Sequence, residues 1–187
     1  MQRTILKSVL LLSLTAIGIF FQSFSQELKL PPEGKSLVYF VRSNATGMLI
    51  NFKFFDGEKY LGKFNGVKYF TYECEPGEHL FWAASENRSF IEANLQSGKT
   101  YIIEVKPTSG AMKAGVKLVP IAPDNTKALK YINKLISKKE PIDLDARDFS
   151  GEAEDLDFFI KNGLKKHMND KTKDKSITKL NPEHAHN

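Results

Sequence analysis

Short runs in which hydrophobic and polar residues alternate fill the chain between residues 36 and 121. A period of two residues indicates β-strands with one buried face and one solvated face. Eight such runs predict strands over residues 36–42, 48–55, 58–64, 67–75, 78–85, 90–95, 100–106 and 115–121. This number of strands predicts a mainly β fold, an antiparallel β-sandwich or partly open barrel.

Turn residues separate these runs and predict a meander of strands between residues 56 and 82. Glycine follows aspartate, asparagine or proline at three of the turns, and such dipeptides favour antiparallel pairing. The structural turn residues are Asp56, Gly57, Asn65, Gly66, Pro76, Gly77 and Gly98. Pro120 lacks a backbone N–H group, so the last run is expected at an edge of the sheet.

After residue 122 the hydrophobic period lengthens to that of amphipathic helices. A first helix is expected over residues 126–137, with Asp124 or Asn125 as its N-cap. A second is expected to begin after Ser150 as its N-cap. The two apolar stripes consist of Leu129, Ile132, Leu135 and Ile136, and of Leu156, Phe159, Ile160 and Leu164. Both stripes are expected to cover the sheet face that carries Trp82.

The termini complete the expected domain organisation. Residues 1–25 combine a basic start with an apolar run, and the small residues Ser23 and Ser25 predict a signal peptide cleaved after Ser25. An uncleaved anchor over residues 5–24 is the alternative. The mature protein is expected to be periplasmic or secreted. Residues 26–122 would form the sandwich, residues 123–168 a helical appendage and residues 169–187 a disordered basic tail.

Charge and cysteine content exclude several classes of function. The net charge is +5, and the expected signal peptide contributes two of these charges. The remaining charge is too small to indicate a nucleic-acid partner. Cys74 is the single cysteine, so no intramolecular disulfide forms. Asp143, Asp145 and Asp148 lack the glycine and glutamate of a calcium loop, and no metal or cofactor is expected.

Candidate chemistry centres on Cys74 and His79, because motifs for phosphate binding, thiol redox chemistry or zinc and serine hydrolysis are missing. A hairpin at Pro76-Gly77 would place the Cys74 thiol opposite the His79 imidazole. Two roles are open for these side chains: they could act as a catalytic nucleophile and its base, or they could be part of the hydrophobic core. We expect a buried thiol, since no carboxylate has a spacing that would orient His79.

Trp82 and His79 are the candidate ligand-binding residues. Trp82 lies on the strand face opposite His79 and would serve either as a platform for a ligand or as a surface for the helices; we expect helix cover. The lysines of residues 126–138 also leave two interpretations open, a solvated outer face, which we expect, or a membrane-surface helix. They are Lys127, Lys130, Lys134 and Lys138.

The order of motifs resembles bacterial secreted domains of the PEGA-like class and a related family of unknown function. The resemblance covers residues 36–105 and is carried by Asp56-Gly57, Leu61-Gly62, Pro76-Gly77-Glu78-His79 and Gly98-Lys99-Thr100-Tyr101. It implies a β-sandwich of the cell envelope, usually without known catalysis and often attached to other envelope components. It brings no catalytic residues to carry over.

These observations favour an exported, non-catalytic binding or scaffolding module of the cell envelope. Its partner would be an envelope protein or polymer that the sequence does not identify. The alternatives are an exported enzyme that uses Cys74 and His79, and a membrane-surface protein that uses the helix over residues 126–138.

Overall fold

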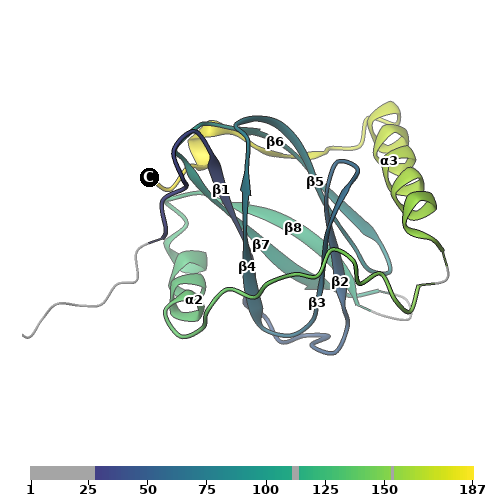
Figure 1. Cartoon of the computed structure of the whole chain (residues 1–187), viewed down its shortest axis with the longest axis horizontal. Helices are drawn as coiled ribbons and strands as arrows, with labels where there is room; N and C mark the ends of the chain where they lie inside the picture. Colours follow the sequence, from purple (N-terminus) through teal and green to yellow (C-terminus); the bar gives the residue numbers. More distant parts are fainter. Residues whose placement is uncertain (1–27, 111–113, 153) are drawn as a thin grey trace, which may run out of the picture.

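Two β-sheets pack face to face in the computed structural model, which describes residues 28–110, 114–152 and 154–187 (Figure 1). Sheet A has the strand order β4-β1-β7-β8, and sheet B has the order β3-β2-β5-β6-β9. The strands are β1 (Ser36–Arg42), β2 (Phe52–Asp56), β3 (Lys59–Phe64), β4 (Lys68–Cys74), β5 (Gly77–Ala84), β6 (Arg88–Leu95), β7 (Thr100–Thr108), β8 (Gly115–Ile121) and β9 (Thr178–Leu180). The predicted sandwich is confirmed.

The strand pairing is mixed rather than wholly antiparallel. β1 runs parallel to β7, and β6 runs parallel to β9, whereas the other neighbouring strands are antiparallel. Strands far apart in the sequence therefore become neighbours inside each sheet. β8 lies at an edge of sheet A, as Pro120 predicts.

Aromatic side chains fill the space between the two sheets. Phe40 of β1 stacks on Phe70 of β4 with 4.7 Å between ring centroids, and its ring meets the edge of Phe81 from β5. Phe81 and Ala83 face this core, while Leu80, Trp82 and Ala84 face outward from sheet B. The alternation of side chains along residues 78–85 therefore predicted the two faces of β5 correctly.

The expected hairpin between β4 and β5 is wrong. β4 pairs with β1, which places Cys74 opposite Ser36, and β5 pairs with β6, which places His79 opposite Ala93. The chain crosses from sheet A to sheet B at Pro76 and Gly77, where the Gly77 φ is +114°. A Pro-Gly turn can reverse the chain either within one sheet, as a hairpin, or between two sheets, as it does here. Crossing lets the apolar faces of both strands meet across the core.

Helix α2 (Thr126–Ile136) covers the outer face of sheet A, and its Asn125 side chain caps Ala128 N–H, as predicted. Ile132, Leu135 and Ile136 pack against Leu37 and Tyr39 of β1. The expectation that both helices cover the Trp82 face is therefore wrong for α2. Each sheet has an apolar outer face, so each needs its own helix.

Helix α3 (Leu156–Thr172) covers the outer face of sheet B. Its N-cap is Asp155, whose carboxylate accepts a hydrogen bond from Phe158 N–H, and not Ser150 as expected. Its contacts bury Phe55 completely and leave Lys53 only 7% exposed, paired with Glu152. The solvated face expected for β2 is thus wrong, because a helix distant in sequence covers it.

The predicted disordered tail is also wrong. The chain continues from α3 into β9 and the short 3-10 helix η1 (Pro182–His184). β9 pairs with β6, and its Leu180 is completely buried among the side chains between the sheets. One apolar residue is enough here, because the neighbouring strand satisfies the backbone of the tail.

The expected signal peptide or anchor lies outside the described residues. Within the part of the chain that is described, no helix has the length and apolar character needed to cross a membrane.

Candidate functional site

The predicted Cys74–His79 pair is replaced by a different set of contacts at one end of the sandwich. His79 Nδ1 lies 2.7 Å from Asp56 Oδ2, and its Nε2 lies 2.8 Å from the carbonyl oxygen of Glu75. The Tyr72 hydroxyl donates to the same Asp56 oxygen at 3.2 Å. Asp56 therefore joins sheet A, through Tyr72, to sheet B, through His79.

The expectation that no carboxylate orients His79 is wrong. Asp56 ends β2, and the register of β2 with β5 places it opposite Phe81, two residues from His79. The sequence assigns Asp56 to a local turn with Gly57, which it also forms. Only the pairing of two strands separated by β3 and β4 brings its carboxylate to the imidazole.

Both ring nitrogens of His79 face hydrogen-bond acceptors, an arrangement that favours the imidazolium, which donates at both positions. The hydrogen bond to Asp56 raises the pKa of His79; burial opposes this, and the Glu75 carbonyl adds to it. An imidazolium has no lone pair with which to accept a proton. Through Asp56 and Tyr72, the ring links the two sheets.

The Cys74 thiol is buried. Its side chain lies on the inner face of β4, with Sγ 4.0 Å from the carbonyl oxygen of Ser36. Burial raises the pKa of the thiol to about 12, and the Asp56 and Glu75 charges act in the same direction. Since the thiolate is the nucleophile, this environment opposes covalent catalysis.

We expect the free energy of unfolding to fall as the pH rises above 6.5, the ordinary pKa of histidine. The raised pKa of His79 means that its proton stabilises the fold fully below this value. That contribution is lost as the pH passes through the pKa of the folded state. Urea denaturation between about pH 6 and 9 measures this slope. It should be absent in His79→Gln.

His186→Gln is the matched control. Burial lowers the pKa of His186, whose Nε2 donates to the Ile121 carbonyl, so its contribution is lost only as the pH falls below 6.5. This variant should keep the slope above pH 6.5. An unchanged slope in His79→Gln would contradict the assignment of the cation.

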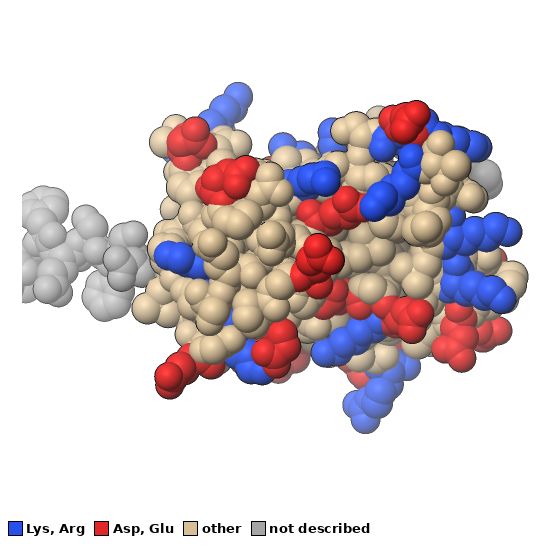
Figure 2. Space-filling model, turned by 90° about the horizontal axis from the view of Figure 1, so that it is seen from above, with Lys and Arg blue, Asp and Glu red and all other residues tan. Residues whose placement is uncertain are grey.

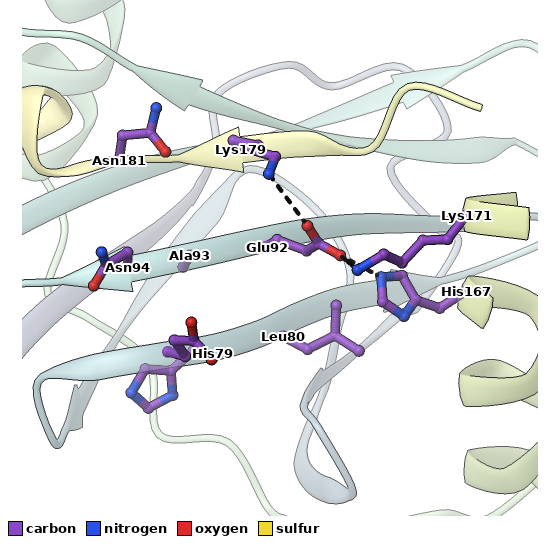
Figure 3. A pocket seen from close by; sticks show the side chains of 10 residues that line it. His79, Leu80, Glu92, Ala93, Asn94, His167, Lys171, Lys179 and Asn181 are labelled. Carbon is purple, nitrogen blue, oxygen red and sulfur yellow. Dashed lines mark hydrogen bonds and ion pairs between the residues drawn. The ribbon is translucent and has the colours of Figure 1, made fainter. Parts of the chain in front are cut away.

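A polar groove of about 570 Å³ lies on the outer face of sheet B, where the cover by α3 ends. Glu92 of β6 lies at its centre, with one carboxylate oxygen 2.7 Å from Lys171 Nζ and 3.1 Å from His167 Nε2 (Figure 3). The other oxygen lies 3.7 Å from Lys179 Nζ. The remaining lining residues include Glu78, Leu80, Asn94 and Asn181.

Three elements far apart in the sequence position this cluster. The registers place Leu80 of β5 and Lys179 of β9 directly beside Glu92. His167 and Lys171 are one helical turn apart near the end of α3, so both side chains reach the same carboxylate. The sequence prediction missed the cluster because it treated the β9 segment as disordered. One feature of the sequence could have predicted that His167 faces sheet B. It lies about one helical turn beyond Gly163 and Leu164, on the inner side of α3.

Glu92 is anionic at neutral pH. The hydrogen bond from Lys171 lowers the pKa of Glu92 most; burial opposes it, while the charge of Lys171 and the contact with His167 add to it. Of its basic neighbours, Lys171 and Lys179 are 51% and 65% exposed and available to a ligand, whereas His167 is buried. Figure 2 shows basic and acidic side chains interspersed over the end of the body that carries α3. The groove thus offers both signs of charge.

Of the two residues predicted for ligand binding, His79 is among those that line this groove and Trp82 is not. The His79 ring points away from Glu92, on the other side of β5 (Figure 3). Trp82 is completely buried between Phe55 and α3, and its indole N–H donates to the carbonyl of Gly57 at 2.9 Å. The expected helix cover of Trp82 is confirmed, and the platform alternative is excluded.

Among residues 28–110, 114–152 and 154–187, no group of three or more His, Cys, Asp or Glu side chains is arranged to hold a metal ion. Asp145 pairs with Arg147, and Asp148 pairs with Lys63. These two carboxylates of the 143–148 segment therefore have basic side-chain partners.

The sequence matches no protein-family model and no curated protein. The resemblance to PEGA-like domains therefore stays a prediction.

Proposed function

We propose that this protein is an exported, non-catalytic binding or scaffolding module of the cell envelope, and that its ligand binds in the groove over Glu92. The observation that carries the proposal is the position of Glu92 in an open groove, beside three basic side chains. A concave site with a few converging polar groups is the usual form of a ligand-binding site.

The surroundings of Cys74 and His79 support binding over catalysis. A nucleophilic cysteine needs a lowered thiol pKa and a neighbouring base, whereas here the thiol is buried and the imidazole donates from both nitrogens. The resemblance to secreted envelope domains favours the same reading.

The groove suits a ligand that carries both amine or amide groups and carboxylates, such as a peptide segment of an envelope polymer. Glu78 and Asn94 offer acceptors along one side. Lys179 is 65% exposed and lies 3.7 Å from Glu92, so it keeps donor capacity for an incoming carboxylate. Leu80 gives the floor an apolar contact.

Filling the groove tests this proposal. Asn94 is exposed on β6, so Asn94→Trp should place a large ring in the groove without disturbing the core. Asn133→Trp, at an exposed position on α2, is the matched control. Co-sedimentation with membrane-free envelope polymer should fall at least about tenfold for Asn94→Trp, because the new ring occupies the space of the ligand. Equal retention of the wild type and both variants would refute the site, and no retention of the wild type would refute the polymer ligand.

Cysteine labelling tests the absence of catalysis. Because Cys74 is buried, a thiol reagent should not label the native protein until it unfolds. Cys74→Ser should lower the free energy of unfolding by roughly 1 to 3 kcal/mol, since it buries a hydroxyl group. Rapid labelling of the native protein, with unchanged stability in Cys74→Ser, would favour the exported enzyme.

A further inference from the structure

The outward side of α2 carries a row of lysines. Their spacing of three or four residues places them on one side of the helix. All four are exposed, and Tyr131, between them, is 60% exposed. The row, called the α2 lysine face below, consists of Lys127, Lys130 and Lys134 on the helix and Lys138 in the turn that follows its C-cap.

The α2 lysine face differs from the basic side chains of the groove in lacking acidic partners. Lys171 and Lys179 pair with Glu92, and Lys166 pairs with Asp170. Across the described ranges, with their gaps at 111–113 and 153, no ion pair involves any of the four lysines of the α2 lysine face. Their charges are therefore available to an external polyanion.

The apolar side of α2 is already occupied. Ile132 is completely buried and Ile136 is 2% exposed, both against the outer face of sheet A. The helix therefore has no apolar stripe left to insert into a bilayer. What remains is an electrostatic contact with anionic headgroups, with Tyr131 as an amphipathic side chain suited to the interface.

The chain enters the body beside this helix. Leu28 packs into the same cluster as Ile132, while Lys29 and Leu30 are exposed, Leu30 to 70%. Residues 1–27, which contain the apolar run of residues 5–24, precede this point. Figure 1 shows the chain entering at the end of the body that carries α2, with α3 at the opposite end.

We propose that the α2 lysine face binds the anionic phospholipid surface of a membrane. The exposed apolar and amphipathic side chains Leu30 and Tyr131 favour a lipid surface over a soluble polyanion. This inference concerns a different surface from the groove and does not depend on its ligand. It leaves the groove, beside the C-terminal half of α3, away from the membrane contact.

Two charge-reversal variants test the proposal on the chain recovered after export. Lys130→Glu/Lys134→Glu alters the α2 lysine face, and Lys161→Glu/Lys165→Glu makes the same change, at the same spacing, on the exposed side of α3. Each is sedimented with phosphatidylcholine vesicles with and without phosphatidylglycerol. Any binding by the apolar N-terminal segment is shared by all the proteins and is read from the neutral vesicles.

The wild type should partition more strongly onto the anionic vesicles in low salt, and this gain should disappear near 1 M salt, where the Debye length is about 3 Å. Since one lysine near an anionic surface contributes roughly a fivefold gain, the α2 variant should partition at least about tenfold less. The α3 variant should behave like the wild type. Equal losses in the two variants, or no preference of the wild type for anionic lipid, would overturn the proposal.

A second measurement needs no variant. Acylation of native protein, followed by peptide mass spectrometry, should show that anionic vesicles protect Lys130 and Lys134 but not Lys161 and Lys165. Equal protection of the two pairs would also overturn the proposal. Since no envelope polymer is present, neither result depends on whether the groove binds its proposed ligand.

Discussion

Replacing Gly163 with alanine is expected to destabilise the protein, although the same change inside a helix normally stabilises it. Gly163 lies on α3 directly above the Trp82 indole. A Cβ atom at this position would lie 2.5 Å from Cη2 and 2.9 Å from Cζ2 and Cζ3 of the ring. Trp82 is stacked on Phe55 at 3.7 Å and is completely buried, so it has no room to move. The expected loss is roughly 1 to 3 kcal/mol of unfolding free energy, measured by urea denaturation.

A double-mutant cycle separates this clash from other effects of the substitution. Trp82→Phe removes the ring atoms that a Cβ at residue 163 would meet. In that background Gly163→Ala should cost nothing or stabilise the protein, because the helix propensity of alanine then dominates. The same loss in both backgrounds would show that the helix does not rest on Trp82 at this point.

Loss of β9 should destabilise the protein more than its length of three residues suggests. Leu180 is completely buried among the side chains between the sheets, so Leu180→Ala should lower the unfolding free energy by roughly 2 to 5 kcal/mol. A chain that ends at Lys175 should lose at least as much, because it also removes the pairing of β9 with Ile91 and Ala93. Thermal melting and urea denaturation measure both effects.

Lys179→Ala is the control on the same strand. Its side chain is 65% exposed, so the change should stay within about 0.5 kcal/mol. If the chain ending at Lys175 melted at the same temperature as the wild type, β9 would contribute nothing to the sandwich. The tail would then behave as the sequence alone predicts.

The sequence by itself determined the first eight strands, the two faces of β5 and the first helix. Alternation in residues 78–85 assigned Phe81 to the core and Trp82 to the opposite face, and both assignments are confirmed. The 3.6-residue period of α2 likewise assigned Ile132 to the buried side and Lys130 to solvent. These properties are local, because the side on which a residue lies follows from the backbone geometry of its own element.

Only the tertiary structure decided which strands became partners. Local periodicity reports that Cys74 and Phe81 are buried, but not that their strands belong to different sheets. Partner choice depends on how all the apolar faces are buried together, so Asp56 reaches His79 only after β2 has paired with β5.

The groove and the tail depend on the same long-range burial. Leu180 is a weak signal in a polar segment, yet between the sheets it meets a complete apolar surface. Its burial fixes β9 beside β6 and so brings Lys179 to Glu92, while packing of α3 on Trp82 brings His167 to the same carboxylate. The residues of this site come from three segments that lie far apart in the chain, so no motif with a recognisable spacing marks the site in the sequence. Each residue is placed by contacts with other segments and not by contacts within its own.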